Sequence, residues 1–160
     1  MEIRTLGDPV LREKCRDVDT LDKEIEELVE EMGETLHLAS GLGLAASQVG
    51  VLKRLFVYDI GYGVRHLVNP EIVESDGEEP LEESCLSLPG ISVQIPRGER
   101  VKLKCTAPSG QRMIIEAWGL MAQMFQHECD HLDGILIIDR CEGEQRRQAL
   151  EEYRDLELQR

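Results

Sequence analysis

One short stretch of the chain, Gln126 to Gly134, limits the possible folds more than any other part of the sequence. It contains His127 and His131, which on a helix project from one face and can both reach one tetrahedral metal ion. Glu128 lies beside the first histidine, where it can take a proton from a water molecule at the metal. Apolar residues recur at helical spacing around this motif, namely Leu120, Met121, Met124, Phe125 and Leu132. The sequence therefore predicts a metal-binding helix, ending near Gly134, at the edge of an apolar core.

Two histidines need at least one further protein ligand, and the sequence offers three sources for it. A third histidine of the extended motif would fall at Ile137, which cannot coordinate a metal. A downstream glutamate, Glu151 or Glu152, lies in a run of alternating charges that is typical of a solvent-exposed helix. Cys85 lies among small, uncharged residues between an acidic stretch and a Pro-Gly turn, where its thiolate could bind the metal.

The cysteine content indicates reduced thiols. The chain has 5 cysteines, an odd number without paired spacing, and no basic, apolar leader, so we expect a cytosolic protein without disulfides. Cys129 lies two residues from each histidine, which turns it away from the metal face of the helix. Cys129 is therefore predicted to be a small buried hydrophobe, and we expect the same of Cys15, Cys105 and Cys141.

Length and charge exclude several other classes of protein. A chain of 160 residues is most consistent with one domain, residues 1–160. No apolar run approaches ~18 residues, so no membrane span is expected. The net charge of −14 disfavours non-specific binding to nucleic acid or to an anionic membrane.

Helical and strand patterns interleave without a regular βαβ repeat, which favours an α+β fold. We expect short antiparallel or mixed sheets packed around the metal-binding helix, with one helix near each end of the chain. The first helix is capped by Asp19-Thr20, the last spans about 142–158, and an acidic loop covers 74–83. Strands are expected at Leu55–Ile60, His66–Val73, Ile91–Ile95, Arg100–Thr106, Gln111–Ala117 and Ile135–Ile138, with a hairpin turn at Gly61-Tyr62-Gly63.

The glycine-rich loop Gly41–Gly50 does not resemble a nucleotide site. It lacks the lysine and Ser/Thr of a phosphate loop, and it follows a helix instead of a strand. Gln48 is the one strongly polar side chain in this apolar segment. A buried amide aimed at the metal site could donate a hydrogen bond to a developing oxyanion.

Three separated motifs together resemble those of the peptide deformylase family. They are Gly41-Leu42-Gly43-Leu44-Ala45-Ala46-Ser47-Gln48, Glu83-Ser84-Cys85-Leu86-Ser87 and Gln126-His127-Glu128-Cys129-Asp130-His131-Leu132. The opening Gly7-Asp8-Pro9-Val10-Leu11 is also similar to that family, so the likeness covers nearly the whole chain. One position departs from the family pattern, because Ser84 stands where glycine is usual.

The resemblance implies removal of the formyl group from N-formylmethionyl peptides, which yields formate. It implies a divalent metal held by Cys85, His127 and His131, usually Fe²⁺, although the ligand set would also accept Zn²⁺, Ni²⁺ or Co²⁺. Glu128 would move the proton, and the Gln48 amide and the Leu86 backbone N–H would hold the oxyanion. The family binds its peptide as an added strand near Leu42, Gly43 and Ser84. The methionine pocket would be formed by Leu42, Leu120, Met124 and the His127 ring.

The sequence does not decide between this function and two alternatives, and it also leaves open a contact with the ribosome. One alternative is a metallopeptidase that uses Glu151 or Glu152 as third ligand. The other is a weakened deformylase-like binding protein, suggested by Ser84. A ribosome contact through the last helix has little support, because Arg146-Arg147 are surrounded by as many acids as bases.

Overall fold

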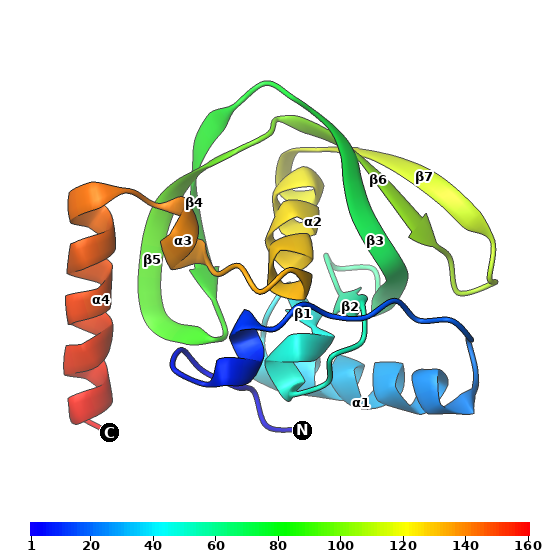
Figure 1. Ribbon diagram of the computed structural model, residues 1–160, viewed down its shortest axis with the longest axis horizontal. Helices are drawn as coiled ribbons and strands as arrows, with labels where there is room; N and C mark the ends of the chain where they lie inside the picture. Colours follow the sequence, from blue (N-terminus) through cyan, green and yellow to red (C-terminus); the bar gives the residue numbers. More distant parts are fainter.

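The computed structural model describes residues 1–160 and places two antiparallel sheets on either side of one central helix, α2 (Gly119–Leu132) (Figure 1). The larger sheet has the strand order β1-β2-β3-β6-β7, and the smaller one pairs β4 with β5. The strands are β1 (Gly43–Ala45), β2 (Leu55–Tyr58), β3 (Arg65–Asp76), β4 (Glu79–Cys85), β5 (Leu88–Arg97), β6 (Arg100–Thr106) and β7 (Arg112–Trp118). The predicted α+β class, with short antiparallel sheets around a central helix, is therefore confirmed.

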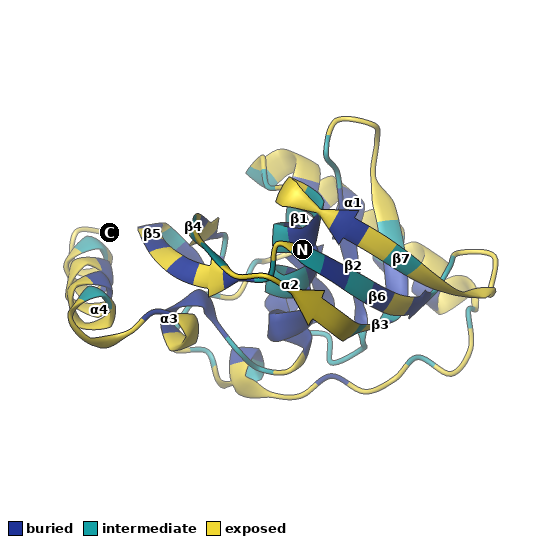
Figure 2. Ribbon diagram, turned by 90° about the horizontal axis from the view of Figure 1, so that it is seen from above, coloured by how far each residue is buried: buried dark blue, intermediate teal, exposed yellow.

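Two longer helices lie towards opposite ends of the molecule. Helix α1 (Lys23–Ala39) packs its apolar face against β2, and α4 (Gly143–Leu158) packs beside β5 (Figure 2). The boundaries of α4 agree with the prediction. The predicted cap of α1 was wrong, because Asp22 and not Asp19-Thr20 caps this helix through a hydrogen bond from the backbone N–H of Ile25.

The segment predicted as an acidic loop, 74–83, consists mostly of strand, so this prediction was wrong. The end of β3 pairs with the start of β6, where the guanidinium of Arg100 contacts the carboxylates of Glu74 and Asp76. A turn at Gly77, with a φ of 71°, then leads into β4. The acidic residues are tolerated in these strands because the adjacent strand supplies the opposite charge.

Two other local predictions also differ from the structure. The predicted strand Ile135–Ile138 is in part a short helix, α3 (Ile137–Arg140), because the Asp139 side chain accepts a hydrogen bond from the Leu136 backbone N–H. A short apolar run does not by itself distinguish a buried strand from a buried helix. The loop Gly41–Gly50 contains β1 and a 3₁₀ turn, η2 (Ala46–Val49), and a second 3₁₀ turn, η1 (Pro9–Arg12), follows the predicted N-terminal turn. The predicted hairpin is confirmed, because β2 and β3 are antiparallel.

Helix α4 covers the outer edge of the smaller sheet. Ala149 and Tyr153 are buried against β5, and the Gln145 side chain bonds both the backbone N–H and the backbone C=O of Gln94. These bonds are 2.7 and 2.8 Å long, and they occupy main-chain groups that a further strand would otherwise use. No helix of the structure combines the length and apolar character needed to cross a membrane.

Candidate metal centre and active site

Helix α2 has two buried faces, one towards the larger sheet and one towards the ligand cluster. One face packs into the core of the larger sheet through Ala122, Phe125, Cys129 and Leu132. The other face points towards β4 and η2 and carries Met124, His127, Glu128 and His131. Both faces follow the helical period of about 3.6 residues, so packing against the sheet fixes the rotation of the helix and with it the direction of the histidines. The prediction that Cys129 faces away from the histidines is confirmed.

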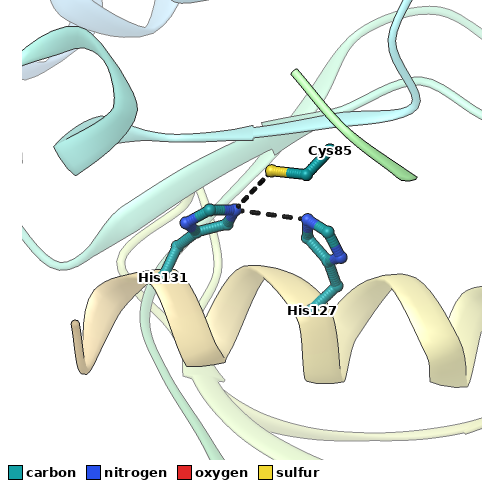
Figure 3. A group of neighbouring side chains, drawn as sticks. All are labelled: Cys85, His127 and His131. Carbon is teal, nitrogen blue, oxygen red and sulfur yellow. Dashed lines mark hydrogen bonds between the residues drawn. The ribbon is translucent and has the colours of Figure 1, made fainter. Parts of the chain in front are cut away.

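Three metal-ligand side chains from distant parts of the sequence meet beside α2 (Figure 3). The Sγ of Cys85, at the end of β4, lies 3.2 Å from Nε2 of His131, which itself lies 3.2 Å from Nε2 of His127. All three atoms lie within 4.8 Å of one another. Two atoms bound tetrahedrally at about 2.0–2.3 Å from one ion lie roughly 3.3–3.7 Å apart. The cluster therefore has the dimensions of a metal site.

The hydrogen bonding of His127 shows that this cluster fits a metal. Its Nδ1 lies 2.8 Å from Oε1 of Glu83, and because a carboxylate only accepts, Nδ1 carries a proton and Nε2 is the ring atom left to bind a metal. Nε2 faces a second imidazole and a sulfur, an arrangement that is stable only with a cation or proton between them. Without metal, burial opposes ionisation of Cys85, but the charge and hydrogen bonds of both imidazoles place its pKa well below that of a free thiol.

A buried ion-pair network supports the first histidine from behind. Burial alone would raise the pKa of Glu83, but Arg97 and His127 outweigh it and hold this pKa at about 2. The Arg97 guanidinium donates to both Glu83 oxygens, at 2.7 and 2.9 Å, and to Asp130 Oδ2 at 2.7 Å. Arg140 holds the same Asp130 carboxylate from α3. Glu83 and Arg97 are almost fully buried, so this network fixes the orientation of the His127 ring.

Replacing Arg97 by methionine is expected to lower the free energy of unfolding by about 3–5 kcal/mol, because buried Glu83 loses its arginine and Asp130 keeps only Arg140. Urea denaturation of the metal-free protein measures this loss. Arg100→Met is a matched control: Arg100 contacts three carboxylates, but on the surface, where water screens the charges. A loss no larger for Arg97→Met than for Arg100→Met would contradict the prediction.

Glu128 lies deep in the site with an unused oxygen. The residue is 2% exposed, and its Oε2 is buried without a hydrogen-bond partner. Burial raises the pKa of this carboxyl group, although the nearby imidazoles oppose the shift. Gly43 allows the carboxylate to lie here, because a Cβ at this position would come within 2.6 Å of Glu128 Oε1. A carboxylate in this position suits proton transfer better than packing.

Gln48 points its amide at the ligand cluster. Its Oε1 accepts a hydrogen bond from the Ala45 backbone N–H at 2.9 Å, which fixes the amide so that Nε2 is the donor on the other side. Nε2 lies 3.1 Å from Ser87 Oγ and 3.7 Å from Cys85 Sγ. Gln48 is 1% exposed, so this N–H group is a fixed donor inside the site.

A cavity of about 550 Å³ opens in front of these side chains. Every residue expected to bind substrate lies along it: Leu42, Gly43, Ser84, Leu120 and Met124. Gln48, Cys85, Leu86, His127 and Glu128 also line it, whereas His131 does not. The sequence predictions did not assign several other residues of the wall to the site, among them four larger side chains: Glu82, Leu88, Ile91 and Gln123. Nothing in their local sequence distinguishes these four from ordinary strand and helix residues.

The predicted alternative third ligands lie outside the site. Glu151 and Glu152 are exposed on α4, and the Glu151 carboxylate is paired with Arg147 at 2.6 Å. They are not part of the cysteine and histidine cluster. The metallopeptidase interpretation therefore gets no support from the structure.

The fold and the site together define a class of protein: a mononuclear metal-dependent hydrolase with a Cys-His-His ligand set. The family model of polypeptide deformylase matches residues 1–147. The chain is 49% identical over 138 residues to the peptide deformylase of Clostridium botulinum, covering 86% of this chain and 94% of that protein. It is 45% identical over 155 residues to that of Acidothermus cellulolyticus, with coverage of 97% and 86%.

Solved structures agree with this result. The crystal structure of a peptide deformylase from Legionella pneumophila superposes with a TM-score of 0.92 at 38% identity, covering 98% of this chain and 94% of that one. The chain belongs to the polypeptide deformylase family and is a hydrolase. The interpretation as a non-enzymatic binding protein gets no support from these comparisons.

Proposed function

We propose that this chain removes the formyl group from the N-terminal formylmethionine of newly made polypeptides and releases formate and a free methionyl N-terminus. One observation carries the proposal: Cys85, His127 and His131 converge at the end of an open cavity, beside the buried carboxylate of Glu128. The membership of the deformylase family supports the same reaction.

In this proposal Cys85, His127 and His131 hold one divalent metal. Such an ion would polarise the formyl oxygen and lower the pKa of a bound water molecule. Glu128 takes the proton of the water that attacks the formyl carbon, and then delivers it to the departing amine nitrogen. Glu83 keeps the proton of His127 on Nδ1, so that Nε2 stays available as a ligand atom.

The negative oxygen that develops on the formyl carbon needs hydrogen-bond donors within the site. We assign this role to the side-chain amide of Gln48 and to the backbone N–H of Leu86, the residue that follows Cys85. Both residues line the cavity, and the Gln48 amide is held in place before substrate binds. A donor already in place needs no reorganisation during the reaction.

Gln48→Met is expected to lower kcat by about 10²–10³-fold, because a side chain of similar length replaces the one that donates to the oxyanion. Steady-state formate release measures kcat, and metal content should stay unchanged. Ser87→Ala removes the other partner of the Gln48 amide but keeps the Ser87 backbone N–H that donates to Cys85. This control should lose much less activity. Equal losses in both variants would count against the oxyanion role.

The peptide lies in the cavity as an extended strand and uses main-chain groups near Leu42, Gly43 and Ser84. Its methionine side chain contacts Leu42, Leu120, Met124 and the His127 ring. Support for this position comes from the cavity itself, which all of these residues line. Ser84 places its hydroxymethyl group beside the path of the peptide backbone, where the related proteins usually have only a hydrogen atom. The side chain narrows this path without touching the ligand cluster.

We propose Fe²⁺ as the native metal, with Zn²⁺, Ni²⁺ or Co²⁺ able to occupy the same ligands. A ferrous ion bound by a thiolate is open to oxidation, so the enzyme isolated without oxygen should lose activity in air, whereas the zinc form should keep it. Half-lives of activity with and without oxygen, measured on both forms, check this prediction. Equal half-lives of the enzyme as isolated would exclude iron as its metal.

The proposed place of action is the bacterial cytoplasm, where formylated chains are made. A ribosome contact through α4 is not part of this proposal, since the two arginines that suggested it already lie beside carboxylates. Arg147 contacts Glu144 and Glu151, and Arg146 lies 3.9 Å from Asp139. Such an arrangement does not favour binding to phosphate groups.

The deciding experiment for the function uses formyl-Met-Ala and measures formate enzymatically together with the free amine. Deformylation releases both in equal amounts and leaves the Met–Ala bond intact. Cleavage between methionine and alanine, with formyl-Met as product, would instead establish a peptidase. Acetyl-Met-Ala is a useful comparison, because the added methyl group crowds the end of the cavity.

A further inference from the structure

Strand β7 is a long sheet edge without the features that usually prevent pairing with another chain. It is the outermost strand of the larger sheet and lies on the side of the molecule opposite α4 (Figure 1). The other edges are protected: β1 has only 3 residues, β4 carries Pro80, and Gln145 bonds the main chain of β5. Strand β7 (Arg112–Trp118) contains no proline or lysine, and its pairing with β6 has no bulge. It therefore offers a regular edge to a further strand.

The register of the β6–β7 hairpin shows which main-chain groups of this edge are free. The Ala107 N–H donates to the Gln111 C=O at 2.8 Å, so Gln111 is a hydrogen-bonded position of the ladder. Such positions recur at every second residue of an antiparallel pair. The odd-numbered residues of β7 therefore bond β6. The N–H and C=O groups of Arg112, Ile114 and Glu116 point away from β6, towards solvent.

The side chains of these same three residues share the outer face of the sheet, where all of them are exposed. Ile114 is 62% exposed, which is unusual for a large apolar side chain in a strand. Arg112 has no carboxylate partner within its own chain. Glu116 contacts Arg100 through Oε1 at 2.5 Å, and its Oε2 is unpaired. The edge thus carries an apolar residue between an unpaired cation and a half-used carboxylate.

This arrangement of charges is self-complementary. If a second copy pairs antiparallel with Ile114 opposite Ile114, Arg112 of each copy lies opposite Glu116 of the other. The free main-chain groups then also face each other, as a hydrogen-bonded ladder requires. A pair centred on Arg112 or on Glu116 would instead place like charges directly opposite, which is unfavourable. A two-fold axis at Ile114 is therefore the favoured register.

We propose that β7 is an interface between two copies of this chain, paired antiparallel about Ile114, so that the two larger sheets become one. The outer edges of the joined sheet are the short β1 strands, so the assembly stops at two copies. Each copy carries a net charge of −14 and the contact is confined to one strand, so association is weak and needs concentrated protein. The inference is independent of the proposed function, because no residue of β7 lines the cavity.

Sedimentation velocity of the metal-loaded enzyme, from about 5 to 500 µM, covers the range in which so small an interface associates. The average mass should rise from that of the monomer towards twice that value and not beyond it. Trp118, the only tryptophan, is 59% exposed and comes opposite the β6–β7 turn of the second copy. Over the same concentrations its fluorescence should shift to shorter wavelength and become less sensitive to iodide.

A charge exchange tests the register. R112E alone and E116R alone each place like charges opposite each other at both ends of the paired segment, which should weaken association by about tenfold or more at low salt. In an equal mixture of the two variants, a dimer of one copy of each has opposite charges at both ends again. The mixture should therefore associate about as well as wild type. A mixture that associates no better than either variant alone overturns the register.

A further pair of variants tests the position of the interface. Ile114→Lys brings two ammonium groups together at the two-fold axis and should abolish association. Val73→Lys is the matched control, since Val73 is also an exposed apolar strand residue but lies on β3, inside the sheet. It should associate as wild type does. A wild type that stays monomeric at all concentrations, growth beyond two copies, or equal effects of the two substitutions overturns the proposal.

Discussion

Replacing Glu128 by glutamine is expected to lower kcat for formate release by about 10³- to 10⁴-fold, because the variant has no group that can take and return a proton. The substitution keeps the shape of the side chain, so the metal content should stay the same. Stability should not fall, since Glu128 Oε2 is buried without a partner and a neutral amide is less costly to bury than a carboxylate. Glu128→Gln should therefore lower activity without lowering the stability of the fold.

Rates and thermal unfolding of the same preparations check both parts of this prediction. Glu128→Asp, which retains a carboxylate one methylene shorter, should keep more activity than Glu128→Gln. A glutamine variant with a tenth of the wild-type kcat would show that another group carries the proton. A variant that unfolds at clearly lower temperature would instead mean that the carboxylate stabilises the fold.

Replacing Cys85 by alanine is expected to reduce bound metal from about one ion per chain to about none after dialysis against a weak chelator. Two histidines alone leave the ion with too few protein ligands, so activity should be lost together with the metal. Elemental analysis of the dialysed protein measures the first effect, and formate release measures the second. Of all the changes considered, this one should have the largest effect on metal affinity.

Two controls make the result specific to Cys85. Cys129→Ala removes a thiol that is equally buried but lies on the sheet side of α2, and should keep its metal. Glu151→Ala removes the ligand that the metallopeptidase interpretation requires, and should also keep it. Loss of metal in Glu151→Ala, with retention in Cys85→Ala, would reverse the assignment of the third ligand.

Helix α2, its two histidines and the candidate ligand Cys85 could be predicted because their signals are local. Helical spacing places His127 and His131 on one face whatever the rest of the chain does. Cys85 stood out by its small, uncharged neighbours, and the family resemblance pointed to the same residue. The structure brings these residues together through contacts between α2 and β4 that no local pattern encodes.

The network behind His127 could not be predicted, because charged residues are usually exposed. Glu83 was assigned to an acidic loop, yet it is 6% exposed and is paired with Arg97, itself 4% exposed. The partner of a buried charge lies close in space but far away in sequence, so composition gives no hint of it. One signal was present: on a strand, Glu83 and Cys85 point to the same side, and Cys85 was already a ligand candidate.

The bonds between Gln145 and the main chain of Gln94 have a consequence for how copies of this protein meet each other. A sheet can extend through many molecules only if both of its edge strands have free main-chain N–H and C=O groups, because each molecule must then pair with one neighbour on each side. Here the Gln145 side chain of α4 bonds the main chain of Gln94 on the outer edge of β5. Of the two edges of the small sheet, only that of β4 is left for an extended chain to pair with. Copies of this chain therefore cannot extend the small sheet from both of its edges at once.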